Sequence, residues 1–278
     1  MKKIILAVTA LVIALNVNAQ DSSAKHSVAL NEVTTNSNIS RAWIASLRAE
    51  IMEGLLGTGR VEVLDVTTVE GFPGDESMQI SFLSDKDAET FLKCQFNSLN
   101  TTRKTNDEGK VSWTTKANYT LTLIDVATGG VKSTNTYEES GFSSESDEKA
   151  MASAIGSVSS TMKKFVESAF PLTATIKALD KVHPKKGVES LYITVGSNAG
   201  VQEGQPFEVF VETDIAGSII TKKIEKVTVK VKEVVAPNMS LATVSGKGAV
   251  ELQTAFENGE KVTVVSRPKW NPLDEFIK

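Results

Sequence analysis

Histidine and cysteine, the residues most often used in metal and nucleophilic sites, are scarce in this 278-residue chain. The sequence holds two histidines, His26 and His183, and one cysteine, Cys94. Neither histidine has a second metal-ligating residue at the spacing that zinc sites use. Cys94 alternates with Leu92 and Phe96 in an apolar segment, which predicts a buried, inert thiol. A single cysteine also excludes a disulfide within the chain.

Acidic residues are numerous, but none forms a recognisable catalytic pair. Asp85, Asp87 and Glu89 alternate as at the start of a calcium loop, although the later ligands of such a loop are missing. There is no Gly-x-Ser-x-Gly nucleophile turn, and the glycines of residues 54–59 lack the Lys-Ser/Thr of a phosphate loop. The sequence therefore predicts no catalytic residues, no metal and no cofactor. An unrecognised hydrolase stays open as an alternative.

The first 19 residues have the pattern of a secretory signal peptide. A basic start at Lys2 and Lys3 precedes an apolar run over residues 4–15 and a small-residue ending at Ala19. This pattern predicts cleavage before Gln20 and a periplasmic, soluble protein that begins with a flexible segment at residues 20–25. No cysteine follows the cleavage region, so we expect no direct lipid anchor and membrane association only through partners. An uncleaved anchor is the alternative.

The formal net charge of −4 gives no general attraction for nucleic acid. One lysine-rich stretch stands out within residues 222–232, and its alternation is typical of a solvated strand face. Protein partners are therefore expected rather than nucleic acid.

Residues 26–170 are predicted to form a first, α/β sandwich domain, which must position any site. Its centre is a strand at 111–123 with apolar residues at every second position, a glycine turn at 127–130 and a returning strand at 131–142. Ser144 is predicted to cap one long amphipathic helix that ends before Pro171. The other expected elements are a strand at 26–33, a helix at 39–56 ended by Gly57 and Gly59, a strand at 60–66, an ambiguous segment at 80–87 and a strand at 88–102.

Residues 171–266 are predicted to form a small all-β, barrel-like domain, because short strands there alternate with glycine turns. The expected strands are 173–182, 190–195, 207–212, 218–235, 241–245 and 260–265, with no helix among them. Gly196, Gly200 and Gly204 make the organising structural turn. Gly200 and Gly204 are expected at positive φ, with Val201 as an apolar plug between them. The fold class is thus α+β: a sheet with packed helices, then a barrel.

The carboxy-terminal tail, residues 267–278, carries two aromatic residues between prolines. Aromatic side chains often anchor interfaces. Trp270 and Phe276 are therefore candidate interaction residues, and packing against their own chain is the alternative.

Several segments resemble one envelope-protein family. LLGTGRVEV at 55–63, AETFLKCQF at 88–96 and LTLIDVATGGV at 121–131 are similar to motifs of the curli assembly/transport component (CsgG-like) group. That group includes lipoprotein activators of penicillin-binding proteins and shares its fold with the amino-terminal domain of TolB. The resemblance spans about residues 26–170. Residues 182–265 resemble the carboxy-terminal domain of flagellar assembly protein T, through YITVG at 192–196 and GVQEGQPFEV at 200–209.

The resemblance implies envelope assembly by protein–protein binding rather than catalysis. We expect an exported, non-enzymatic scaffold or accessory protein that binds an envelope partner or associates with itself. Association with the outer membrane is left open. A subunit of a CsgG-like secretion channel is the alternative. It is disfavoured because the lipid-anchor cysteine is missing and because the first domain is too short for two inserted spanning hairpins.

Overall fold

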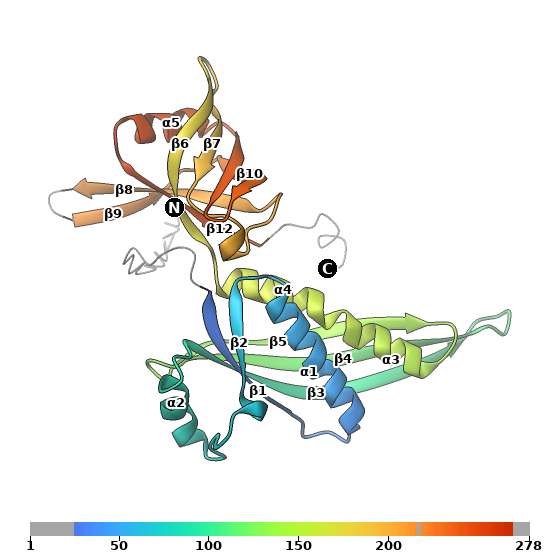
Figure 1. The fold of residues 1–278 in the computed structure, drawn as a ribbon. Helices are drawn as coiled ribbons and strands as arrows, with labels where there is room; N and C mark the ends of the chain where they lie inside the picture. The colour runs from blue at the N-terminus through green and yellow to red at the C-terminus, as the bar shows by residue number, and fades with distance from the viewer. Residues whose placement is uncertain (1–24, 216–217, 269–278) are drawn as a thin grey trace, which may run out of the picture.

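The computed structural model describes residues 25–215 and 218–268. Two parts follow one another along the chain, each with its own sheet and its own apolar core (Figure 1). The first is a sheet covered by helices and the second is a small barrel. The α+β class predicted from the sequence is confirmed.

The first part contains a five-stranded mixed sheet in the order β2-β1-β3-β4-β5. Strand β1 runs parallel to β2 and β3, whereas β3, β4 and β5 form an antiparallel meander. Its elements are β1 (His26–Thr34), α1 (Arg41–Leu56), β2 (Val61–Asp65), the 3-10 turn η1 (Val66–Thr68), α2 (Glu76–Ser84), β3 (Thr90–Thr105), β4 (Val111–Asp125), β5 (Val131–Ser143), α3 (Asp147–Gly156) and α4 (Val158–Ala169).

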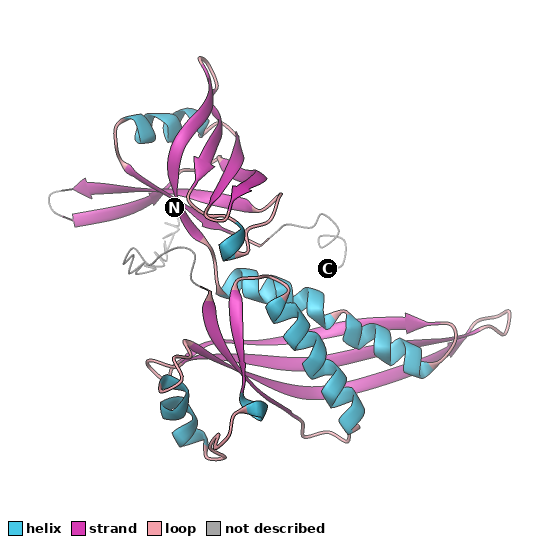
Figure 2. Ribbon diagram, in the orientation of Figure 1, coloured by secondary structure: helices cyan, strands magenta, loops and turns pink. Residues whose placement is uncertain are grey.

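Helices α1, α3 and α4 lie on one face of this sheet (Figure 2). The alternation predicted for the central strand is observed, since Ala117, Tyr119 and Leu121 of β4 are buried beneath the helices. Glycine allows close packing here: a Cβ at Gly54 of α1 would lie 2.3 Å from the Cβ of Met162 in α4. The opposite face carries a small cluster around β1, β2 and the adjoining ends of β3 and β4, which includes Leu83 of α2, Val66 of η1 and Phe91 of β3.

The second part is a six-stranded barrel in the order β10-β11-β7-β6-β12-β8, closed by pairing of β10 with β8. Strand β9 extends beyond the barrel as the partner of β8 (Figure 1). The elements are β6 (Thr173–His183), β7 (Gly187–Ile193), the 3-10 turn η2 (Ser197–Ala199), β8 (Pro206–Ile215), β9 (Ser218–Lys223), β10 (Thr228–Ala236), β11 (Met239–Ser245), α5 (Ala249–Glu257) and β12 (Lys261–Ser266).

The helix predicted before Pro171 is interrupted. It consists of α3 and α4, which meet at Ser157, and Ser146 rather than Ser144 caps its start. The Ser157 hydroxyl donates to the carbonyls of Ser153 and Ala154. A side chain that bonds the preceding turn often bends a helix.

Two expectations for the second part are wrong. A helix, α5, lies where none was predicted; Gly248 precedes it and makes no side-chain cap, so the usual start signal is missing. The single strand expected at 218–235 is two strands, because the chain turns at Lys226, which has a φ of 57°. Lysine rarely adopts this left-handed conformation, so the sequence carried no turn signal there.

Two uncertain features of the first part are settled. The ambiguous segment at 80–87 is mostly helical, as part of α2, whose first turn is capped by the Asp75 carboxylate. Gly57 does end α1, but it is right-handed with a φ of −65°, and Gly59 supplies the left-handed residue. Among the described residues, no helix combines the length and the apolar character needed to cross a membrane.

Candidate functional site

The predicted chemistry-bearing residues are dispersed in the structure. His26 pairs with Glu89, with 2.6 Å between Nδ1 and Oε2, and its ring lies 5.0 Å from that of Phe170. His183 accepts a backbone hydrogen bond from Lys185 at the β6–β7 turn, in the other part of the molecule. Across residues 25–215 and 218–268, no group of three or more metal-ligating side chains occurs.

Cys94 lies on β3 and is only 2% exposed. Burial raises the pKa of its thiol to about 12, so the reactive thiolate is not populated near neutral pH. The predicted burial of Cys94 is confirmed.

The predicted turn at Gly196, Gly200 and Gly204 joins the two parts of the molecule. Gly200 and Gly204 have φ values of 71° and 81°, as expected, and Val201 between them is buried. Gly196 is extended and lies so close to the β10–β11 turn that a Cβ would be 2.1 Å from the Ala236 carbonyl oxygen. A Cβ at Gly200 would lie 2.3 Å from the carbonyl oxygen of Thr58 in the first part.

A buried arginine lies at the same junction. Arg60 is 2% exposed, and its guanidinium donates to the carbonyls of Glu167 and Phe170 and to Oε1 of Gln205. These carbonyls end α4, where helices leave acceptors without internal partners. Burial lowers the pKa of Arg60, and the nearby Glu167 carboxylate opposes that shift. Neither Arg60 nor Gln205 was singled out from the sequence; an arginine directly before an apolar strand was the available signal.

A second polar cluster lies between β5 and the helices. The Tyr119 hydroxyl donates to Oε1 of Glu139 at 3.3 Å, and the ring of Tyr137 stacks on that of Tyr119 at 5.5 Å. Burial raises the pKa of Glu139, while hydrogen bonds from Thr161 and Tyr119 act in the opposite direction. The sequence signal was an acid at a core-facing position of the alternating strand, since Glu139 follows Tyr137 by two residues.

Strand β5 is one of the two edge strands of the first sheet, and with 13 residues it is much longer than the other, the five-residue β2. Within the described residues it pairs only with β4, so one side of its 13-residue backbone lacks a neighbouring strand. Val131 and Phe142, near its two ends, are 63% and 64% exposed. An open strand edge with exposed apolar side chains is a template for pairing with another chain.

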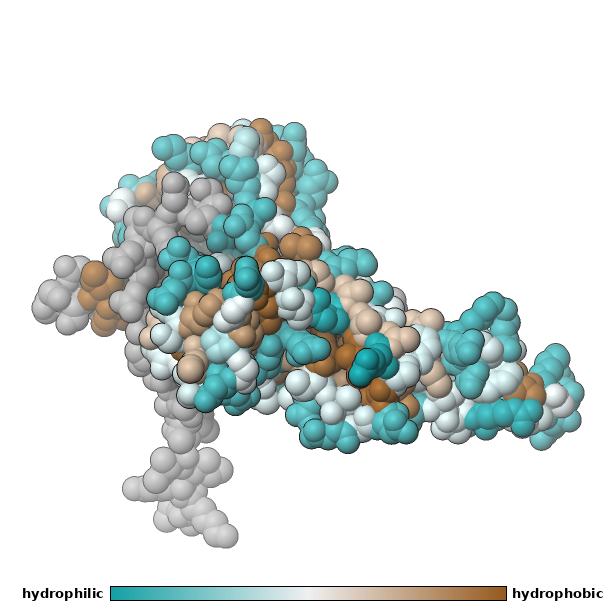
Figure 3. All heavy atoms as spheres, turned by 60° about the horizontal axis from the view of Figure 1, so that its bottom comes forward, coloured by the Kyte–Doolittle hydropathy of each residue, from teal (hydrophilic) through white to brown (hydrophobic). Residues whose placement is uncertain are grey.

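The uncovered face beside this edge is polar. Asn97 on β3 donates to Asn118 and Thr120 on β4, and the hydroxyls of Thr120 and Thr136 are 2.9 Å apart. Viewed from that side, hydrophilic residues dominate the far end of the long strands, at the β3–β4 turn (Figure 3). The internal hydrogen bonds hold β3, β4 and β5 together, and within the described residues the outer edge of β5 has no neighbouring strand. The two aromatic candidates of the tail, Trp270 and Phe276, lie outside the described residues.

No family model matches the sequence, and no curated protein sequence does either. The resemblance to the curli assembly group and to flagellar assembly protein T therefore stays a prediction.

Several solved structures are similar to about half of the chain. A PelC dodecamer from Paraburkholderia phytofirmans is 19% identical, over 50% of this chain and 88% of that chain, with a TM-score of 0.35. Lipoprotein GNA1162 from Neisseria meningitidis is 11% identical, over 49% and 97%, with a TM-score of 0.35. The LpoB C-terminal domain from Escherichia coli is 14% identical, over 44% and 87%, with a TM-score of 0.31.

These neighbours are bacterial proteins, and two of the similar structures carry the name lipoprotein. The expectation that this chain lacks a lipid anchor stays a prediction. The segment on which that expectation depends, before residue 25, is outside the described residues.

Proposed function

We propose that this protein is an exported, non-enzymatic component of the bacterial cell envelope that acts by binding protein. It acts as a scaffold or accessory factor in the assembly of the envelope or of a surface structure. The molecule that binds at the edge of its sheet is a second copy of the chain or a partner protein. The observation that carries the proposal is the open edge of β5.

The edge has the features of a pairing surface. Adding a strand to β5 would satisfy its free backbone groups and cover the exposed Val131 and Phe142 side chains. Its charges limit indiscriminate pairing, since Lys132 and Glu138 on this strand already form ion pairs with Asp125 and Lys116. A stable contact between copies would have to bury more than about 1,000 Å², which requires neighbouring surface as well as the strand.

Light scattering on the exported chain tests the proposal directly. We expect an assembly larger than a monomer, or capture of a specific protein from envelope extracts. The double substitution Thr134→Lys and Thr136→Lys places two charges on the edge strand and should abolish that association. Thr114→Lys, on the interior strand β4, is the matched control and should leave it intact. A monomeric wild-type protein that captures nothing would refute the proposal.

The tail is tested separately by removing residues 268–278. Among the described residues, the last bonds that tie this end to the barrel involve Arg267, whose carbonyl accepts from Gln205 and whose amide donates to the carbonyl of Pro206. Truncation after Arg267 should therefore preserve the fold. If Trp270 and Phe276 anchor a partner, the truncated chain loses assembly or capture; an unchanged result removes them as interaction residues. No specific observation among the described residues favours the secretion-channel alternative or the hydrolase alternative.

A further inference from the structure

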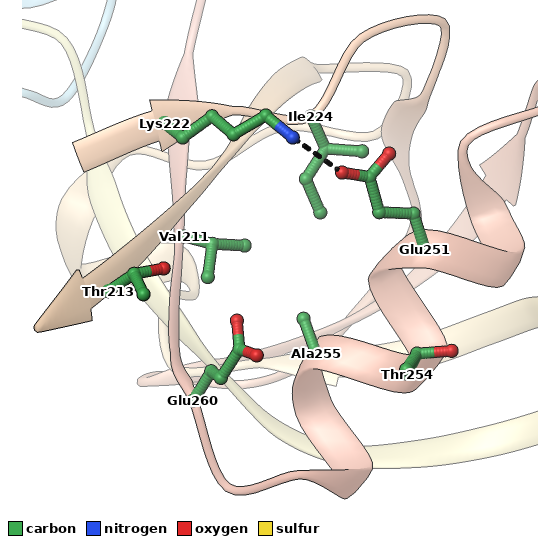
Figure 4. Close-up of a pocket in the computed structure, with 8 residues that line it drawn as sticks. All are labelled: Val211, Thr213, Lys222, Ile224, Glu251, Thr254, Ala255 and Glu260. Carbon is green, nitrogen blue, oxygen red and sulfur yellow. Dashed lines mark hydrogen bonds and ion pairs between the residues drawn. The ribbon is translucent and has the colours of Figure 1, made fainter. Parts of the chain in front are cut away.

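A hollow of about 360 Å³ lies between the β8–β9 hairpin and α5, on the second part of the molecule and away from the β5 edge (Figure 4). It falls within the size range of small-ligand sites. The residues that line it are Val211, Thr213, Lys222, Ile224, Glu251, Thr254, Ala255 and Glu260.

The hollow has an apolar wall. Val211, Ile224 and Ala255 are each less than 9% exposed and belong to the barrel core. The exposed Ile220 lies opposite Thr213 in the β8–β9 register, on the same face of the hairpin as Lys222. An aliphatic stem entering the hollow would therefore contact apolar surface along its length.

Its charged rim has an excess of one negative charge. Lys222 and Glu251 form an ion pair across one side, with 3.1 Å between Nζ and Oε1. The Glu260 carboxylate points into the hollow from the opposite side (Figure 4). This carboxylate takes no part in the hydrogen bonds and ion pairs found among the described residues. With one ammonium and two carboxylates, the hollow favours a cation.

The local fold holds Glu260 in this place. Helix α5 ends in a Schellman motif: the amide of Gly259 donates to the carbonyl of Phe256, and that of Glu260 to the carbonyl of Ala255. Gly259 has a φ of 76°, which glycine adopts without strain. These backbone bonds fix the main chain of Glu260 at the helix end, from which its side chain points into the hollow (Figure 4).

We propose that this hollow binds the side chain of a lysine or arginine presented by a partner peptide. The aliphatic stem would lie against Val211, Ile224 and Ala255, and the cationic head would bind Glu260. This site is distinct from the β5 edge, so a negative light-scattering result does not bear on it, and its own failure leaves the assembly proposal standing.

The test is a titration of isotope-labelled protein with N-acetyl-lysinamide, followed by amide chemical shifts. We expect saturable shifts at residues that line the hollow, with a dissociation constant on the order of millimolar, and weaker binding at high salt. N-acetyl-norleucinamide has a similar apolar stem without the charge, and it should bind at least about fivefold more weakly.

Variants identify the groups responsible. Glu260→Gln should weaken binding of N-acetyl-lysinamide about fivefold. Glu257→Gln, on the same helix but outside the lining, is the control and should change nothing. Lys222→Met should strengthen binding, because it frees the Glu251 carboxylate. Well-dispersed spectra show that each variant is folded. Absence of shifts at the hollow, equal binding of the two probes, or an unaffected Glu260→Gln variant would each overturn the proposal.

Discussion

Arg60 of the first part donates a hydrogen bond to the side-chain oxygen of Gln205 in the second part at 3.1 Å, and both side chains are almost fully buried. The amide nitrogen of Gln205 in turn donates to the carbonyl of Arg267 at 2.5 Å. One continuous set of hydrogen bonds therefore links the start of β2, the end of α4 and the residue that follows β12, the last strand of the barrel. The two parts are coupled by buried polar contacts rather than by the connecting residues alone.

Arg60→Met should lower the free energy of unfolding by roughly 2–3 kcal/mol, because it leaves the α4 carbonyls and the Gln205 oxygen without their donor. Chemical denaturation measures the loss, and a second, separate transition is expected if the two parts no longer unfold together. Arg103→Met, at the exposed end of β3, is the control and should cost less than about 0.5 kcal/mol. Equal stability of both variants would contradict the coupling role.

Gly200→Ala should destabilise the protein more than Gly71→Ala does. Both glycines have positive φ, 71° and 76°, so each substitution carries a backbone cost of about 1 kcal/mol or more. Only at Gly200 would the new Cβ also meet backbone, 2.3 Å from the Thr58 carbonyl oxygen, whereas nothing lies within 4 Å at Gly71. Thermal unfolding of the two variants separates the packing cost from the conformational one. Equal losses of stability in the two variants would mean that the backbone at the junction moves aside without an energetic cost.

Glu139→Gln should flatten the pH dependence of stability. A carboxyl group with a raised pKa binds its proton more tightly in the folded state, so its stabilising contribution is lost as the pH rises above its ordinary value of 4.5 and through the raised folded value. The free energy of unfolding of the wild type should therefore fall over that window. The glutamine variant lacks this fall because it does not ionise.

Glu138→Gln is the matched control for the neighbouring residue. Glu138 is on the solvent side of β5 and pairs with Lys116, an exposed contact worth about 0–1 kcal/mol. Its substitution should lower stability slightly at neutral pH and keep the wild-type fall above pH 4.5. If instead Glu139→Gln keeps that fall, burial of Glu139 does not govern the pH response.

Much of the architecture could be predicted because burial follows a simple period. The alternation along β4 fixed which residues face the helices, and the glycines at 200 and 204 marked a turn that only positive φ satisfies. The elements that were not predicted depend on tertiary packing rather than on this period. Helix α5 is short and has no side-chain cap at its start, so packing against the barrel contributes much of its stability.

The junction and the hollow could not be predicted for a different reason. Arg60 and Gln205 are 145 residues apart in the sequence, and only the packing of the barrel elements brings Glu260 to the same hollow as Lys222 and Glu251. No local pattern encodes such pairings, because they follow from tertiary topology. The alternation of the strand identifies Glu139 as an acid on a buried face. It does not identify Tyr119 as the residue whose hydroxyl donates to that acid.

Residues 172–267 should fold alone, in a form that also tests the junction. The barrel closes on itself through the β8–β10 pairing, and its ends are tied because Leu172 and Ser266 exchange two hydrogen bonds. Circular dichroism should show strand with one short helix, α5, and cooperative unfolding. In this fragment Gly200→Ala should cost only its backbone term, about 1 kcal/mol, since Thr58 is absent. A disordered fragment would show that the barrel needs the first part, and an equal cost of Gly200→Ala in fragment and full chain would show that the close approach to Thr58 carries no energy.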